Sequence, residues 1–336
     1  MNSPERNVAR RHHTVPQFYL RGFADNDQIA TIRLPGDQRF VQSVKDASVA
    51  KNFYSVEGHL GGEDVIEKEL SKIEGAVAAI LKKIVTGSWP LDPADRMSLG
   101  FFVALQATRV PVQRRSMERM AAQIMRLQIG AGGKDSLRKR LEKQGGEVND
   151  ELVENVWDLA TQPGGPRLQM SNAGHIKHMV ELAESLVKYI VGRPWVLVNF
   201  DRRSIFTSDS PVGLIPHPKD EPWRGVGYMT AWGVTLPLTR KLGLLMGNPQ
   251  AFIDGRFPVE RVHQGEVDRK QFGSTALERL FNGTTVMNAS EWLFHHPNDE
   301  KFVPEKLPMP DAVGMEMGGE SMEFSGDPWF KTKESS

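Results

Sequence analysis

The chain has 336 residues, 39% of them hydrophobic and 25% charged, so it can bury a sizeable core in one large domain or two small ones. Its 42 basic and 42 acidic residues cancel, so any attraction to nucleic acid or membrane must be local. The absence of cysteine excludes disulfides, thiolate nucleophiles and cysteine-bound zinc. A polar N-terminus and the lack of a long apolar run predict a cytoplasmic protein that does not enter a membrane.

An early segment, residues 11–23, places histidines, arginines, a glutamine and a tyrosine among apolar residues. Buried imidazoles need hydrogen-bond partners, so this run is either a satisfied structural corner or one wall of a site. In the second case His12 and His13 are candidate catalytic residues, acting as general bases or metal ligands. Gln17 and Tyr19 are then candidate substrate-binding residues.

The pattern His12-His13-x-Val15-Pro16-x-Phe18-Tyr19-Leu20-x-x-Phe23 resembles the signature that opens domain-of-unknown-function family 4238. The resemblance covers roughly residues 10 to 296, with further matches in the family's order at residues 52–54, 74, 106–111 and 207–212. Some members of that family look like bacterial anti-phage defence genes. The resemblance therefore implies a defence context, and it carries no catalytic residue over.

Two strands are expected at residues 28–34 and 38–44 around a Pro-Gly-Asp turn, with a third at 53–56. An amphipathic helix should follow from about residue 63 to 85, because apolar residues recur there at alternating spacings of four and three. Glu74 lies at the edge of its apolar stripe. It is either a solvated glutamate or a half-buried acid whose pKa suits catalysis.

A second helix should begin after Asp92, a good N-cap, and run through an apolar stretch central to the core. Gln106 and Arg109 share one face near its end, before Pro111, which we expect to kink the helix. A buried arginine must be paired. Arg109 therefore either forms a structural ion pair with a glutamate or binds a phosphate bidentately, with Gln106 beside it as a substrate ligand.

Residues 108–143 carry ten basic and three acidic side chains, which makes this stretch a basic arm in a neutral protein. The arm can face nucleic-acid phosphates through Arg115, Arg119 and Arg126. Alternatively, it is a solvated helical hairpin that turns at the glycine-rich residues 130–133.

The second half of the chain should contain a mostly antiparallel sheet. Helices are expected at residues 147–160, 171–191 and 262–281, and strands at 195–200, 204–207, 229–238 and 242–247. Asp209 follows the second of these strands, on a turn stiffened by Pro211. A carboxylate in that position is either an ordinary turn residue or a catalytic acid and metal ligand.

The expected fold is α+β, with an N-terminal hairpin, a central helical block and a mostly antiparallel C-terminal sheet. Residues 10–296 should form a single domain with a helical arm at about 108–160, and residues 297–336 a loosely ordered tail. Motifs of serine hydrolases, P-loop NTPases, Rossmann dehydrogenases and zincins are absent from the sequence.

Two classes of function stay open, and both expect at least three of five residues to line one pocket: His12, His13, Glu74, Arg109 and Asp209. In the first, the protein is a phosphodiesterase-like hydrolase, specifically a metal-dependent nuclease effector in anti-phage defence. Glu74 and Asp209 would then hold Mg²⁺ or Mn²⁺. In the second, the same residues form a non-catalytic binding or sensor site for a phage product or a nucleotide. The basic arm and the implied defence context favour the first; the sequence does not determine the oligomeric state.

Overall fold

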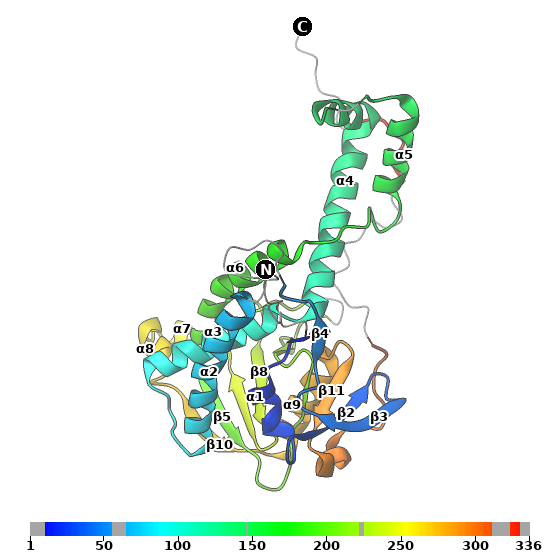
Figure 1. The fold of residues 1–336 in the computed structure, drawn as a ribbon. Coiled ribbons are helices and arrows are strands. Elements are labelled where there is room, and N and C mark those ends of the chain that lie inside the picture. Colours follow the sequence, from blue (N-terminus) through cyan, green and yellow to red (C-terminus); the bar gives the residue numbers. More distant parts are fainter. Residues whose placement is uncertain (1–10, 56–64, 146, 222–224, 311–322, 330–336) are drawn as a thin grey trace, which may run out of the picture. The chain divides into compact units, whose positions relative to one another are not determined.

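The structure is a computed structural model that describes residues 11–55, 65–145, 147–221, 225–310 and 323–329 (Figure 1). The fold is α+β, as predicted, and it divides into two compact units. The sheet unit comprises residues up to Val110 together with Asn172–Ala312. The helical unit comprises the described residues of Pro111–Ser171 together with residues 323–329. No helix in the described ranges has the length and apolar character needed to cross a membrane.

The larger sheet of the sheet unit has five strands in the order β10-β5-β9-β8-β7. Its strands are β5 (Trp195–Asn199), β7 (Gly213–Ile215), β8 (Gly233–Thr239), β9 (Leu242–Met246) and β10 (Arg269–Phe272). All pairs are antiparallel except β10 with β5. The expectation of a mostly antiparallel sheet is therefore confirmed.

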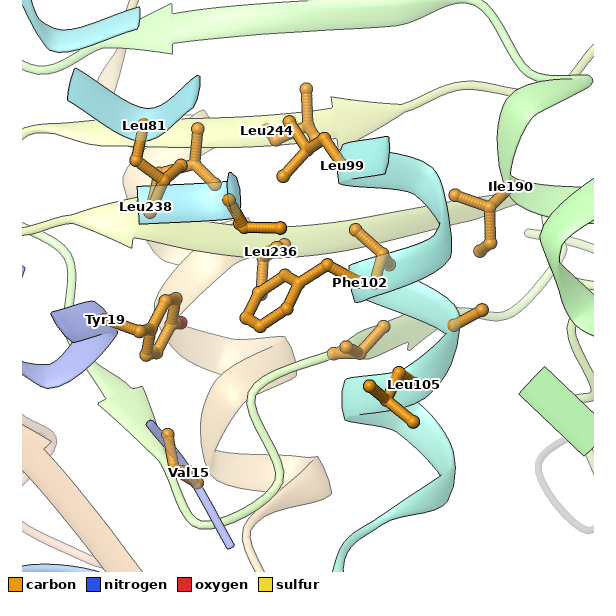
Figure 2. Close-up of a cluster of buried hydrophobic side chains, with 14 of the residues drawn as sticks. Val15, Tyr19, Leu81, Leu99, Phe102, Leu105, Ile190, Leu236, Leu238 and Leu244 are labelled. Atoms are coloured by element: carbon orange, nitrogen blue, oxygen red, sulfur yellow. The ribbon is translucent and has the colours of Figure 1, made fainter. Parts of the chain in front are cut away.

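Helices pack on both faces of this sheet because its strands are apolar on both sides. On one face lie α2 (Val65–Val85), α3 (Pro93–Thr108) and α6 (Asn172–Val191), and on the other α9 (Thr275–Asn288). Figure 2 shows the face covered by α2 and α3, where Leu99 and Phe102 of α3 lie near Leu244 and Leu236, and Leu81 of α2 lies near Leu238. Asp92 caps α3 as predicted, because its carboxylate accepts hydrogen bonds from the backbone of Ala94 and Asp95.

The smaller sheet has the order β3-β2-β11-β6 and contains the predicted hairpin. Its strands are β2 (Gln28–Arg33), β3 (Gln38–Ser43), β6 (Thr207–Ser208) and β11 (Trp292–His295). We expected β6 to follow β5 in one sheet, but it pairs with β11 in the other. The side chain of Asn282 accepts a hydrogen bond from the Phe206 backbone and so guides the chain from one sheet to the next.

The N-terminal residues form a small separate ladder. Here β1 (Arg11–His13) pairs with β4 (Val49–Lys51) and leads into α1 (Gln17–Leu20) and a 3₁₀ helix at Arg21–Phe23. We expected a strand at residues 53–56, but the described part of this range, residues 53–55, does not form one. These residues follow a turn at Asn52, whose φ is 52°. The third strand lies at β4 instead.

The helix expected at residues 262–281 was also wrong. The chain forms α7 (Gln250–Asp254), α8 (Val259–His263), β10 and α9 in this region. Gly265, with φ of +80°, ends the first part of the expected helix, and Asp268 is drawn into a buried ion pair with Arg96. Beyond α9, the described start of the expected tail is ordered, because Pro297–Phe302 form a 3₁₀ helix and Val303 is buried.

The helical unit contains α4 (Pro111–Lys143) and α5 (Asp150–Thr161), which pack around Leu137, Val153 and Trp157. Pro111 starts a new helix rather than kinking the previous one, since α3 ends at Thr108. The alternative of a helical hairpin placed a turn at residues 130–133, and α4 is indeed broken there. Gly133, with φ of 74° and ψ of 169°, is non-helical, and α4 consists of two helical segments joined across a kink at this residue.

Candidate functional site

Arg109 is the centre of a buried polar cluster in the sheet unit. It is fully buried at the C-terminal end of α3, and three of its nitrogens donate to the protein. Its Nε lies 2.6 Å from the carbonyl oxygen of Thr14, Nη2 lies 3.1 Å from that of His13, and Nη1 lies 2.9 Å from Oε1 of Glu74. The guanidinium is thus engaged as a structural clamp between α2, α3 and the N-terminal ladder.

Gln106 shares the Thr14 carbonyl with Arg109. Its Nε2 donates to that oxygen over 3.0 Å, and because a carbonyl can only accept, this bond fixes the orientation of the amide. The other amide atom, Oε1, is buried and has no hydrogen-bond partner among the described residues. One acceptor is therefore left over beside the clamp.

The two histidines belong to the same corner. Nδ1 of the buried His12 accepts the backbone N–H of Tyr54 over 2.8 Å, and the two rings lie 5.5 Å apart. Nε2 of His13 lies 3.1 Å from the carbonyl oxygen of Lys45, to which the neutral imidazole donates. Burial lowers the pKa of His13, so this ring is neutral at neutral pH.

Tyr54 places a phenol in the cluster. Its side chain is buried, and its hydroxyl has no hydrogen-bond partner among the residues that the structure covers. Burial raises the pKa of Tyr54 to about 12. The positive charge of Arg109 lowers this pKa, whereas the negative charges of Glu67 and Glu74 raise it further. The hydroxyl therefore keeps its proton at neutral pH and can both donate and accept.

Glu67 and Glu74 lie seven residues, or two turns, apart on α2, so their side chains share one face. Burial and the neighbouring Glu74 raise the pKa of Glu67, while Arg109 opposes the rise. Tyr54 and Glu67 were missed as site residues by the sequence analysis. The available signals were the family match at residues 52–54 and the two-turn spacing of Glu67 from Glu74.

Asp209 lies at the junction of α9 and β11. Its carboxylate accepts backbone N–H groups from Ser290, Glu291 and Trp292 at 2.8, 2.9 and 3.3 Å. The structure thus brings Glu74 and Arg109 to the backbone of His13 and Thr14, while these bonds commit Asp209 to shaping the turn into β11.

Asp209 should make stability depend on pH. Burial raises the pKa of Asp209 from 3.8 to about 6. Between these two pH values the carboxyl is protonated in the folded chain and ionised in the unfolded chain. The resulting stabilisation is complete below pH 3.8 and is lost as pH rises through 6. We expect the free energy of unfolding to fall by about 3 kcal/mol across this window.

Asp209→Asn is the matched control because an amide does not titrate. The difference in free energy of unfolding between wild type and variant, measured by urea titration at successive pH values, isolates the carboxyl from other titrating groups. Parallel curves for the two proteins would contradict the raised pKa.

The remaining predicted substrate-binding residues have contacts of their own. Tyr19 is buried, and its hydroxyl donates to the carbonyl oxygen of Pro237 over 2.6 Å and lies 2.9 Å from Oγ1 of Thr207. Gln17 is half-buried, with Oε1 3.5 Å from Nη2 of Arg21. Tyr19 is therefore a hydrogen-bonded core residue.

The basic arm separates into exposed and buried arginines. Arg115 and Arg119 are exposed on α4. Arg126 is only 1% exposed, donates from Nε to the Thr161 carbonyl oxygen over 2.9 Å, and lies 5.1 Å from the Phe324 ring centre. We predicted that Arg126 contacts nucleic acid. The structure corrects this prediction, because the guanidinium of Arg126 is buried within the helical unit.

The two carboxylates that we expected to hold a divalent metal have protein partners: Glu74 pairs with Arg109, and Asp209 faces three N–H donors. Within the described ranges, no group of three or more His, Asp or Glu side chains is arranged to hold a metal ion. Glu74 and Asp209 are therefore each held by different protein groups in this structure.

The fold and the cluster define an α+β protein whose N-terminal ladder is clamped by a buried arginine. The chain belongs to the family described as "Protein of unknown function (DUF4238)", which matches residues 11–299. Neither a search of curated proteins nor a search of solved structures found a match.

Proposed function

We propose that the cluster around Arg109 is a non-catalytic recognition site for a small ligand rich in hydrogen-bond donors. The observation that carries the proposal is the pair of buried polar atoms, the Tyr54 hydroxyl and Gln106 Oε1, that lack partners among the described residues. A buried polar atom left unpaired costs about 1–3 kcal/mol. Two such atoms in the cluster around Arg109 lower the stability of the ligand-free protein. This cost is expected where a bound ligand supplies the missing hydrogen bonds.

The charges around these atoms favour an uncharged or cationic ligand over a phosphate. Arg109 already donates to two carbonyl oxygens and to Glu74, so little of its charge is available to an anion. Glu67 and Glu74 add acidic groups on the adjacent face of α2. Gln106 Oε1 can only accept, and the ligand must therefore offer an N–H or O–H group to it.

The test is a binding series with defined probes: the four ribonucleosides, their monophosphates and spermidine. We expect an uncharged or cationic member to raise the melting temperature and to give a calorimetric binding signal. Tyr54→Phe and Gln106→Leu should each weaken that signal at least tenfold, the effect of about 1.4 kcal/mol for one lost hydrogen bond. Binding of the monophosphates alone, or binding that both substitutions leave intact, would contradict the proposal.

We propose as a second candidate the phosphodiesterase-like hydrolase, acting as a nuclease in anti-phage defence. Its support is a pair of carboxyl groups on one face of α2, in which burial and Glu74 raise the pKa of Glu67. Such a pair can supply one acid and one base, with the neutral His13 in the same cluster. Arg115 and Arg119, exposed on the basic arm, are the side chains suited to positioning a nucleic acid.

Cleavage assays separate the two candidates. Single-stranded DNA and RNA are incubated with the protein in Mg²⁺, in Mn²⁺ and in EDTA, and the reactions are repeated with Glu67→Gln. Cleavage that Glu67→Gln abolishes supports the hydrolase. Intact substrate under all conditions, with ligand binding retained, leaves the recognition site as the function.

A further inference from the structure

Two glycines of α4 lie against the C-terminal residues 323–329, within the helical unit. A Cβ atom added to Gly130 would come within 2.3 to 2.5 Å of ring atoms of Phe324. A Cβ atom added to Gly133 would lie 2.7 Å from the backbone nitrogen of Pro328 and 2.8 Å from the carbonyl oxygen of Gly326. Both positions therefore require glycine because another piece of chain occupies the space of a side chain.

The C-terminal segment is also hydrogen-bonded to the helix. The backbone N–H of Lys134 donates to the carbonyl oxygen of Gly326 over 2.8 Å, and that of Trp329 donates to Ala131 over 2.9 Å. Helical backbone normally uses these groups internally, and the non-helical Gly133 is what makes them available. The segment thus completes an interruption that is built into α4.

Two aromatic side chains anchor the segment. The Phe324 ring packs with the apolar cluster of α4 and α5 and lies 5.1 Å from the Arg126 guanidinium. Trp329 stacks on Phe324, with ring centres 5.4 Å apart. We name the receiving surface, formed by Arg126, Gly130, Ala131, Gly133 and Lys134, the glycine groove. Large aromatic anchors with few hydrogen bonds are typical of peptide-binding sites.

We propose that the glycine groove is a peptide-binding site that a second copy of this chain can fill with its own residues 323–329. The chain supplies the complementary sequence, Glu-Phe-Ser-Gly-Asp-Pro-Trp, so every copy carries both halves of the interaction. The twelve residues between Pro310 and Glu323 have a maximum extended length of about 40 Å. Exchange between copies re-forms the same contacts, which makes it a low-cost route to a dimer.

A complementation experiment with full-length chains tests this exchange. Gly130→Ala closes the groove and leaves the segment intact, while alanine keeps α4 helical. The double variant Phe324→Ala with Trp329→Ala leaves the groove open and removes both anchors. Each chain alone should sediment as a monomer, and an equimolar mixture should form a one-to-one heterodimer. An excess of a peptide of residues 323–329 should dissociate it.

Gly132→Ala is the matched control, because a Cβ atom there meets only the side chain of Ser136, at 3.2 Å. With this variant in place of Gly130→Ala, the segment stays in its own groove and the mixture should remain monomeric. Direct binding of the labelled peptide to the Phe324→Ala, Trp329→Ala chain gives a readout independent of Gly130. Failure of the peptide to bind, or a mixture that never forms the heterodimer, would overturn the proposal.

Discussion

Replacing Arg96 with methionine should lower the free energy of unfolding by about 3–5 kcal/mol, because it leaves a buried carboxylate without its partner. The Arg96 and Asp268 side chains are both fully buried, with Nε 2.7 Å from Oδ2 and Nη2 3.2 Å from Oδ1. The guanidinium also lies 4.2 Å from the Trp195 ring centre. Its remaining bonds go to backbone carbonyl oxygens, those of Val191, Arg193 and His263.

This arginine ties α3 to the chain between α6 and β5 and to the start of β10, so its loss should affect cooperative unfolding of the whole sheet unit. Urea denaturation followed by circular dichroism measures the change. Adding Asp268→Asn to Arg96→Met should restore part of the lost stability, since no unpaired charge is then buried. Lys72→Ala, which breaks an exposed pair with Glu69, is the control and should leave the midpoint nearly unchanged. If Arg96→Met changed the free energy of unfolding as little as Lys72→Ala does, the result would contradict a stabilising buried ion pair between Arg96 and Asp268.

Arg109→Ala should cost a comparable amount, about 3–5 kcal/mol, because it removes three donors from buried or half-buried acceptors at once. The carbonyl oxygens of His13 and Thr14 lose a charged donor, and Glu74 loses its ion-pair partner. Arg109→Lys should recover little of this, since one ammonium group cannot reproduce the planar fork that reaches all three acceptors.

The same urea titration measures both Arg109 variants, with Arg115→Ala, an exposed arginine six residues further along the chain, as the control. If Arg109 were held for an anionic ligand and not for the fold, its removal would relieve a buried positive charge. The ligand-free protein would then be as stable as wild type or more so, and that outcome would contradict the clamp.

Local patterns predicted the elements well where the signal lies within one segment. The hairpin of β2 and β3 follows from two short strands on either side of a Pro-Gly-Asp turn signal, and α2 follows from its apolar period. The need to pair Arg109 was also predictable from its place behind an apolar helix. Its acceptors were not, because the Thr14 and His13 carbonyl oxygens are backbone atoms brought to it only by the tertiary fold.

The errors share a physical cause, which is that distant segments decide burial. Arg126 belongs to the basic stretch of α4, yet Thr161 and Phe324 enclose it. Asp268 interrupts a stretch with helical periodicity because its partner, Arg96, lies 172 residues earlier. The sequences around Arg126 and Asp268 do not indicate these contacts, because the contacting residues lie far away along the chain.

The most direct test of the proposed recognition site compares two buried tyrosines. Tyr54→Phe removes a hydroxyl that has no partner among the described residues, so the melting temperature should stay at or above that of wild type. Tyr19→Phe removes a hydroxyl bonded to Pro237 and Thr207, so the melting temperature should fall, consistent with a loss of about 1–2 kcal/mol. If Tyr54→Phe destabilises the protein as much as Tyr19→Phe does, the Tyr54 hydroxyl serves the fold and is not held for a ligand.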